Sequence, residues 1–211
     1  MLFAQGKLEE SLRIRREEQL PVYELLRDVR SLAITRGKIA DVLFARGDLE
    51  EALRIRREEE LPVYARLGDV RALAVTHGQI ADVLFAQGER EEALRLLQDE
   101  TLPAARRLQD PSMMAQALWS SARIRLAQDE LDASGVSEAL KELQESFELN
   151  SRLQRADGIA ASGRLLGQTL VASGLPEPSA GVLDASASAF ERLGHVAEAS
   201  AVRAFRQEHC G

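Results

Sequence analysis

The first part of this sequence consists of two nearly identical copies. Residues 2–42 and residues 43–83 match at 30 of 41 positions, and a looser third copy begins at residue 84 with the same spacing. Pro21, Pro62 and Pro103 recur at this 41-residue interval. Self-similarity at a period of 20 to 50 residues is typical of solenoids, in which each unit buries its apolar face against its neighbours. The sequence therefore predicts a tandem array whose function lies on a surface.

Each copy reads as two amphipathic helices separated by a glycine. Apolar residues recur at helical spacing up to Gly47, and the next helix runs from about Leu49 to Leu67, where Gly68 repeats the stop signal. Asp48 and Asp69 follow these glycines as N-cap candidates. Pro62 lies inside the second helix, where a proline removes a hydrogen bond and crowds the preceding turn. We expect the helix to bend there rather than to break.

The same pattern of helices separated by short turns continues beyond residue 110. Pro111 opens a predicted helix to Leu126, residues 132–135 form a predicted turn, and further helices cover about 137–153 and 159–172. A turn at residues 175–178 then precedes two last helices, which end near residues 193 and 208. The prediction is an all-α fold of about ten helices in five pairs. We treat residues 1–211 as one domain, with units at about 2–42, 43–83, 84–124, 125–169 and 170–211.

Composition narrows the function classes. The formal net charge of −7 and the pI near 5.2 argue against nucleic acid, because phosphate contacts require a basic surface. The one cysteine, Cys210, allows no intrachain disulfide and fits a reducing compartment. The sequence has neither the ~20 apolar residues that span a bilayer nor a signal peptide at its start. We expect a cytoplasmic protein without membrane partners.

No catalytic or cofactor motif appears. The sequence lacks a phosphate-binding loop, a dinucleotide fingerprint, a nucleophile elbow and a metalloprotease helix. His209 and Cys210 are adjacent and cannot complete a tetrahedral metal site. His77 has Arg36 and Leu118 at its copy positions, which gives a catalytic role no support. The prediction is a protein that is not an enzyme and that uses no cofactor or metal.

Small residues recur where the paired helices should touch. They are Ala40, Ala81, Ala122 and Gly167 in the first helices, and Ala52, Ala93, Ala139 and Ala180 in the second helices. With Leu166, Gly167 and Gly174, this pattern resembles the tetratricopeptide repeat over nearly the whole chain. The unit is seven residues longer than the usual 34 of that family, about two helical turns. Such long units are similar to those of kinesin light chains and of bacterial repeat arrays.

The resemblance implies a right-handed α-solenoid whose first helices line a concave groove. In this chain the residues at the groove positions would be aromatic and acidic along most of the groove and basic at its far end. The residues assigned to partner binding are Lys38, Asp41, Phe44, Gln79, Asp82, Phe85, Trp119, Arg123, Arg164 and Gln168. Aromatic anchors flanked by charges suit an extended peptide or a partner helix.

Plainer interpretations of the same residues stand beside this one. Phe44 and Phe85 could simply fill the seam between units, and Asp41 and Asp82 could pair with arginines of adjacent helices. The runs at 13–18 and 54–60 are interpreted as charged outer faces, with Glu9–Arg13 and Glu50–Arg54 as favourable pairs four residues apart. An acidic groove would repel the C-terminal carboxylate that some chaperone-binding members of the resembled family hold.

The leading hypothesis is a protein-interaction module that binds a peptide or partner helix in the groove. One alternative is a scaffold that assembles with itself through an N-terminal seam at Leu2 and Phe3, because solenoid ends need polar caps. Another is the sensor arm of a larger signalling protein.

Overall fold

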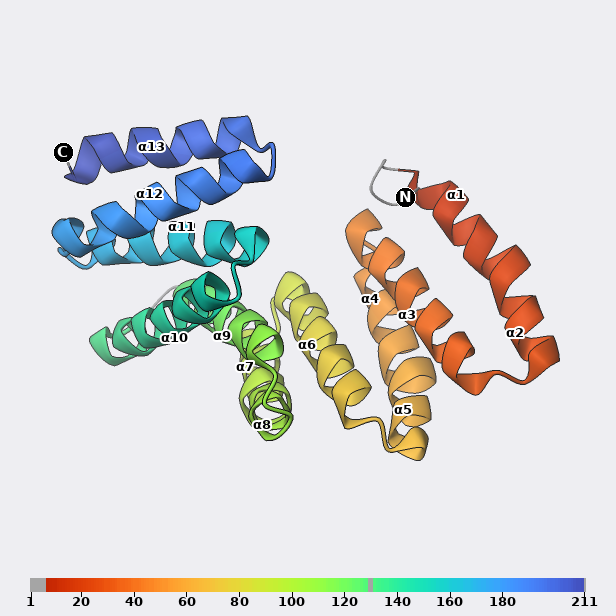
Figure 1. Ribbon diagram of the computed structural model, residues 1–211. Coiled ribbons are helices and arrows are strands. Elements are labelled where there is room, and N and C mark those ends of the chain that lie inside the picture. The colour runs from red at the N-terminus through yellow and green to blue at the C-terminus, as the bar shows by residue number, and fades with distance from the viewer. Residues whose placement is uncertain (1–6, 129–130, 211) are drawn as a thin grey trace. The chain divides into compact units, whose positions relative to one another are not determined.

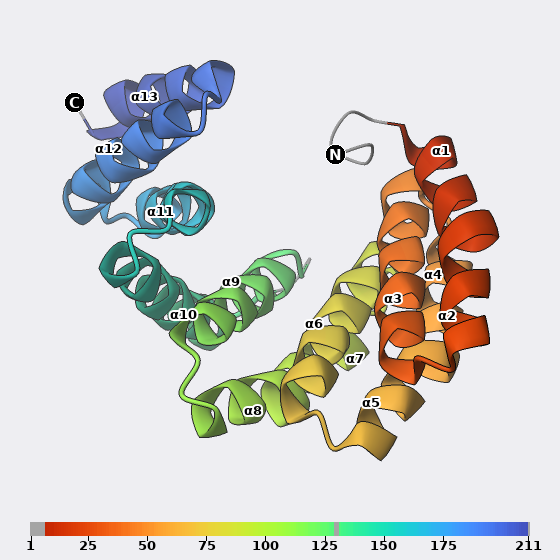
Figure 2. The same cartoon turned by 45° about the vertical axis from the view of Figure 1, so that its right-hand side comes forward.

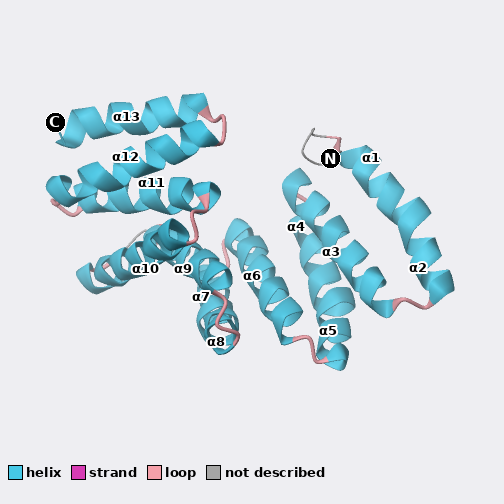
Figure 3. Ribbon diagram, viewed as in Figure 1, coloured by secondary structure: helices cyan, strands magenta, loops and turns pink. Residues whose placement is uncertain are grey.

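The structure, a computed structural model, describes residues 7–128 and 131–210. Every regular element in these ranges is helical, as Figure 3 shows. The α-helices are α1 Leu8–Arg13, α2 Leu20–Leu26, α3 Val29–Arg46, α4 Leu49–Arg54, α5 Leu61–Leu67, α6 Val70–Gln87, α7 Arg90–Leu96, α8 Leu102–Arg107, α9 Pro111–Leu126, α10 Ala133–Arg152, α11 Ala156–Ala172, α12 Pro176–Arg192 and α13 Val196–Cys210. Three π-helical segments are η1 Ile14–Gln19, η2 Ile55–Glu60 and η3 Leu97–Thr101.

Each π-helical segment joins two α-helices end to end. Thirteen α-helical and three π-helical segments therefore make ten continuous helices in the described ranges. Consecutive helices pack in antiparallel pairs, such as α9 with α10 and α11 with α12 (Figure 1). The predicted all-α fold of about ten helices is confirmed.

The chain divides into two compact units, residues 1–104 and residues 105–211. In the first unit, α3 and α6 alternate with the interrupted helices α1–η1–α2 and α4–η2–α5, and Figure 2 shows α3 beside both α1 and α4. In the second unit, α9 to α13 pack in chain order. The assignment of the whole chain to one domain stays a prediction.

The repeated proline follows a π-helical segment each time. The helix stays continuous through Pro62, since the residues on both sides of the junction, Glu60 and Leu61, have right-handed helical dihedrals. The Leu61 amide bonds to the Arg56 carbonyl five residues back, as in a π turn, and Pro62 then stands in the first turn of α5, where proline is well tolerated. The helix therefore accommodates the proline through a local π-helical turn and does not break.

The glycine and aspartate signals are largely as predicted. Gly47 and Gly68 end their helices with φ of 92° and 64°, in the left-handed region that favours glycine. Asp69 caps α6, because its side chain accepts a hydrogen bond from the Ala72 amide at 2.9 Å. Asp48 occupies the N-cap position of α4 but binds Arg46 instead, so its predicted capping bond is wrong.

Two predicted turns are helical. Asp132 accepts the Gly135 amide at 2.7 Å and starts α10 at Ala133, four residues before the predicted start near residue 137. Residues 176–178 belong to the first turn of α12, where Pro176 fits because the first amides of a helix have no partner within it. Both differences arise because the first turn of a helix can have the composition of a loop.

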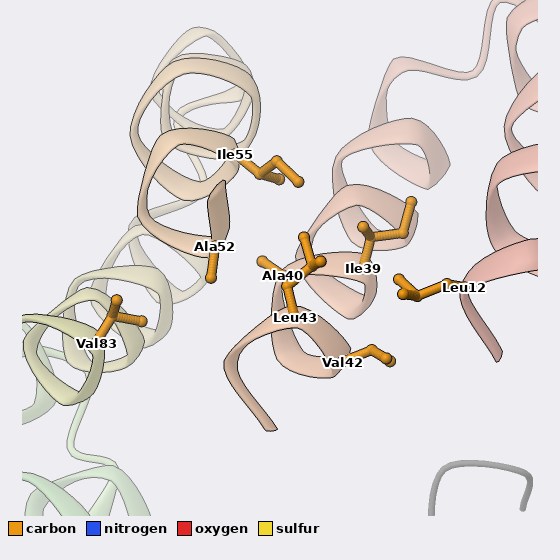
Figure 4. Packing of buried hydrophobic residues seen from close by; sticks show 8 residues of the cluster. All are labelled: Leu12, Ile39, Ala40, Val42, Leu43, Ala52, Ile55 and Val83. Carbon is orange, nitrogen blue, oxygen red and sulfur yellow. The ribbon is translucent and has the colours of Figure 1, made fainter. Parts of the chain in front are cut away.

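The core of the first unit is a seam of aliphatic and small side chains. Figure 4 shows Leu12, Ile39, Ala40, Val42, Leu43, Ala52, Ile55 and Val83 converging from neighbouring helices. Ala40 and Ala52 are both fully buried, which confirms the predicted small-residue contact and lets α3 and α4 approach closely. In the second unit Ala122 and Ala139 repeat it, whereas Gly167 packs against Leu183 rather than against Ala180.

The described part of the chain contains no helix with the length and apolar character needed to cross a bilayer.

Candidate partner-binding faces

The outward side of α3 and α6 carries most of the predicted binding residues. We call this surface the α3–α6 face; its residues are Ile34, Lys38, Asp41, Phe44, Val75, Gln79, Asp82 and Phe85. Ile34 and Val75 occupy copy positions and are 39% and 44% exposed, and Phe44 is 37% exposed. Lys38 is exposed between them, whereas Gln79, Asp82 and Phe85 are half-buried. The face is thus apolar at its ends and polar at its centre.

The centre of this face is built around a residue that the sequence analysis missed. Arg56 of η2 is 2% exposed, and its guanidinium binds Asp41 of α3 and the side-chain oxygen of Gln79 at 2.7 Å. Gln79 also donates to Asp41 at 3.4 Å. Asp41 therefore pairs with an arginine of the adjacent helix, as the plainer interpretation held. Its side chain is still 44% exposed and reaches the surface.

Glu60 completes this group from inside. Its carboxylate lies 3.1 Å from the Arg56 guanidinium and packs against Gly37, where an added Cβ would lie 2.5 Å from Glu60 Oε1. Burial raises the pKa of the Glu60 carboxyl, and the positive charge of Arg56 opposes that rise. A side chain at position 37 would therefore displace the Glu60 carboxylate from its place beside Arg56.

The third copy replaces the charged pair by uncharged side chains. Leu97 and Thr101 stand at the copy positions of Arg56 and Glu60, and both are buried. The Thr101 hydroxyl lies 3.4 Å from the Ala74 carbonyl. An apolar residue at a copy position signals that the position points inward, so this substitution is the sequence signal that could have identified Arg56 as buried.

The charged runs are only partly the outer faces that the sequence predicted. Arg54 binds Glu51 at 2.8 Å and pairs with Glu58 and Glu59 on the surface, and Arg13 pairs likewise with neighbouring glutamates. The predicted pairs Glu9–Arg13 and Glu50–Arg54 are wrong. Each arginine pairs with other carboxylates instead: Arg13 with Glu10, Glu17 and Glu18, and Arg54 with Glu51, Glu58 and Glu59.

In the second unit, the predicted residues lie on α9 and α11, which contact each other. We call this surface the α9–α11 face; it contains Trp119, Arg123, Arg164 and Gln168. The Arg123 guanidinium lies 4.8 Å from the centre of the Trp119 ring, and Arg164 lies 5.7 Å from the Phe190 ring. Arg164 and Gln168 are exposed and Trp119 is half-buried. The predicted basic character of these residues is present, with both arginines placed over aromatic rings.

A hollow of about 530 Å³ lies at the edge of the α3–α6 face. It is lined by Arg15, Lys38, Asp41, Val42, Phe44 and Ala45. Arg15 donates to the Ser11 carbonyl at 3.0 Å, and its Nε is buried without a hydrogen-bond partner. The seam residues Leu2 and Phe3, to which self-assembly was assigned, lie outside the described residues.

The histidines and the cysteine show no arrangement for metal binding within the described ranges, where no group of three or more ligating side chains occurs. Burial lowers the pKa of His77, and nearby Glu100 opposes this shift. His209 contacts the Phe205 carbonyl at 2.9 Å, and the Cys210 thiol lies 3.0 Å from the Ser179 hydroxyl. These groups make local contacts that the packing explains.

No family model matches the sequence, and no curated protein matches it. A solved structure does: the crystal structure of BtubC (BKLC) from P. vanneervenii is similar over 97% of this chain and 89% of that one, with a TM-score of 0.64 and 15% sequence identity. At this identity the likeness shows the fold alone. The chain is therefore an α-solenoid of the tetratricopeptide-like, helical-repeat kind.

Proposed function

We propose that this protein is a non-enzymatic protein-interaction module that binds an extended peptide or a partner helix on the α3–α6 face. The observation that carries the proposal is the exposure of Ile34 and Val75 at copy positions, together with Phe44. Exposed apolar side chains that recur along parallel helices give regularly spaced anchor points. The long-unit tetratricopeptide resemblance agrees with this use of the first helices.

The polar centre of the α3–α6 face would fix the position of a bound peptide along the face. Lys38 and the exposed edge of Asp41 present opposite charges one helical turn apart, and Arg56 fixes the Asp41 side chain from below. A preorganised charge loses less side-chain freedom when a partner binds. Aromatic and aliphatic anchors around such a centre favour a peptide with apolar residues on both sides of a polar pair.

The α9–α11 face is the second part of the proposal. Arg164 and Gln168 are exposed, and Trp119 with Arg123 offers an aromatic surface that carries positive charge. This composition favours acidic peptides. The proposal includes a cytoplasmic location, which the single cysteine supports.

The test begins with selection of binding peptides from a random display library on the immobilised full chain. Selected peptides are then titrated against the wild type and against Phe44→Ala and Val75→Ala. We expect each substitution to weaken binding by about tenfold, the effect of losing roughly 1.4 kcal/mol at an anchor. Leu193→Ala, a similarly exposed residue outside both faces, is the control and should bind as the wild type does.

Circular dichroism checks that the variants keep their helicity. Selected peptides that bind all variants equally would show that the α3–α6 face is not the binding surface. Failure to select any peptide above background would contradict the function itself.

A further inference from the structure

An exposed leucine stands at the end of every other helix in the described ranges. The segments α2, α5, α8, α10 and α12 each end at, or one residue before, such a leucine. These leucines are Leu26, Leu67, Leu108, Leu153 and Leu193. The last four are 38% to 44% exposed, and they include Leu153 in the middle of the second unit. Their exposure therefore belongs to the position in the repeat and does not depend on either end of the chain.

The same backbone turn follows each of these leucines. The next residue has a left-handed φ, between 50° and 78° in the five turns. The amide two residues after the leucine donates to the carbonyl three residues before it, as His195 does to Phe190 at 2.9 Å. In this type of turn the customary apolar contact joins those two residues, and the rings of Phe190 and His195 stack at 6.2 Å. The turn itself therefore does not require an apolar residue at the position of Leu193.

Each leucine has an arginine beside it. In the second unit Arg107, Arg152 and Arg192 directly precede the three leucines, and all are exposed. Arg107 and Arg192, with the neighbouring Arg106, have no ion-pair partner among residues 7–128 and 131–210. Arg152 lies 3.6 Å from Glu148, and its side chain is 75% exposed. The helix dipole favours cations at these helix ends, but it does not account for the leucines beside them.

Three carboxylates at this end of the second unit are already engaged. Asp110 is buried and caps α9. Asp157 binds Arg155 at 2.6 Å, and Glu191 binds Arg203. A chain with a net charge of −7 thus presents uncompensated positive charge at one end of its second unit.

These leucines and arginines lie at the same end of the helices. Consecutive helices are antiparallel, so the turns before α9, α11 and α13 share one end of the second unit, and Figure 1 shows the turns before α11 and α13 there. We call this surface the leucine edge; its residues are Arg106, Arg107, Leu108, Arg152, Leu153, Arg192 and Leu193. It differs from the α9–α11 face, whose residues lie along the sides of the helices.

The chemistry of the leucine edge indicates the kind of partner that fits it. Positive charge beside apolar side chains is complementary to a segment that carries apolar residues among carboxylates. The backbone here is bonded within the turns, as the Arg155 amide is to the Asn150 carbonyl at 3.0 Å. An extended strand needs backbone partners, whereas a helix satisfies its own backbone and binds through side chains. A helix therefore fits this edge better than an extended peptide does.

We propose that the leucine edge binds an acidic amphipathic helix of a partner protein. The apolar side of that helix lies on the three leucines, and its flanking glutamates or aspartates lie on the arginines. A lipid surface fits less well, because the net charge of −7 opposes approach to an anionic bilayer. The leucine edge is additional to the two faces of the proposed function.

The probe is a designed fluorescent helix of about 18 residues, or about five turns, with leucines along one side and glutamates flanking them. It is titrated against the full chain by fluorescence anisotropy, beside matched peptides in which every glutamate is replaced by glutamine or by lysine. We expect saturable one-to-one binding of the glutamate peptide and about tenfold weaker binding of the other two. Raising the salt from about 0.05 M to about 0.5 M should weaken the glutamate peptide several-fold.

Charge reversal in the chain tests the arginines. A triple variant with Arg107→Glu, Arg152→Glu and Arg192→Glu should weaken binding of the glutamate peptide by about tenfold or more. It should also bind the lysine peptide more tightly than the wild type does, a reversal of preference that a misfolded variant cannot produce. Arg164→Glu, an exposed arginine on the α9–α11 face, is the matched control and should leave binding of the glutamate peptide intact.

Substitution of the leucines tests the apolar part of the contact. Leu153→Gln combined with Leu193→Gln should weaken the glutamate peptide by about tenfold. Leu175→Gln is the control, because Leu175 is 47% exposed in the turn between α11 and α12, at the opposite end of the helices. Circular dichroism and thermal denaturation check that each variant is folded.

Five results would overturn the proposal. The first three are no binding of the glutamate peptide up to its solubility limit, equal binding of the glutamate and glutamine peptides, and loss of binding in Arg164→Glu but not in the triple variant. Sedimentation with phosphatidylserine vesicles that the triple variant abolishes, without any peptide binding, would assign the edge to a lipid surface. Self-association in light scattering that the triple variant abolishes and the peptide does not would assign it to a second copy.

The outcome is independent of the proposed function. Val75→Ala should leave binding of the glutamate peptide intact, while peptides selected on the α3–α6 face should still bind the triple variant. Failure of either experiment therefore leaves the other one interpretable.

Discussion

Arg56 binds Asp41 across the contact between η2 and α3, with the guanidinium 2% exposed and the carboxylate side chain 44% exposed. This ion pair connects the interior of the first unit to the α3–α6 face. Replacement of Asp41 would therefore change both the surface presented to a partner and the charge balance of a buried arginine. Binding data on Asp41 variants need a stability measurement beside them.

The buried pair can be exchanged for the uncharged pair that the chain itself uses in its third copy. Arg56→Leu alone leaves Glu60 buried without its cation, and we expect it to lower the free energy of unfolding by about 3 kcal/mol. Arg56→Leu with Glu60→Thr reproduces Leu97 and Thr101 and should recover most of that loss. Urea denaturation followed by circular dichroism measures both. A double variant less stable than the single one would contradict the exchange.

Glu60 should make stability fall as pH rises. Its pKa in the folded chain is raised above its usual 4.5 by burial, so the folded state holds the proton more tightly than the unfolded state does. The contribution of Glu60 is then most favourable below the usual pKa and declines as pH rises from there through the raised folded pKa. Wild type should lose stability relative to Glu60→Gln over this window. A difference that is constant or grows with pH would show that the pKa is not raised.

Asp69 should stabilise the first turn of α6 in its ionised form. The hydrogen bond from the Ala72 amide lowers its pKa, and Arg30 adds to this effect. Asp69→Ala should reduce the free energy of unfolding by about 1 kcal/mol, and Asp69→Asn by less because the amide oxygen still accepts. The charge-dependent part is present above the usual pKa of 3.8 and is lost as pH falls through the lowered folded pKa.

The matched control for this cap is Asp48→Ala. Asp48 stands at the N-cap of α4 without a capping bond, and its solvent-exposed pair with Arg46 should contribute little to stability, so Asp48→Ala should cost less than Asp69→Ala. Chemical denaturation of the three variants at neutral and acidic pH checks both predictions. Equal losses for Asp48→Ala and Asp69→Ala would contradict the assignment of the cap.

Two helical glycines should respond in opposite directions to alanine. A Cβ at Gly167 would lie 2.5 Å from Leu183 Cγ, so Gly167→Ala should destabilise the second unit by about 1 to 3 kcal/mol. A Cβ at Gly181 of α12 meets nothing within 4 Å, so Gly181→Ala should stabilise it by about 0.5 to 1 kcal/mol. Thermal denaturation midpoints compare them, and a shift of the same sign in both would be evidence against this packing.

The copied valines should differ although their sequence contexts match. Val63→Ala removes buried methyl groups and should lower the free energy of unfolding by about 1 to 2 kcal/mol. Val22→Ala changes a half-exposed residue of α2 and should stay within about 0.5 kcal/mol of the wild type. Urea denaturation of both variants is the measurement. Equal losses would contradict the difference in burial between the two valines.

The 41-residue period determined the helical repeat by itself, because apolar spacing and the glycine stops are local signals that a helix needs no partner to display. The small residues Ala40 and Ala52 likewise predicted where two helices would touch. The sequence also supplied the residues of the α3–α6 face, since they share one side of their helices. Their role in binding a partner remains a prediction.

Only the tertiary structure decided which members of a charged run turn inward. Arg54 and Arg56 are alike as residues, and the burial of Arg56 depends on Asp41 and Gln79 arriving from two other helices. The same holds for Val22 and Val63, which have the same local sequence and opposite exposure. Burial depends on which elements pack against a helix, and the sequence of a nearly identical copy does not contain that information.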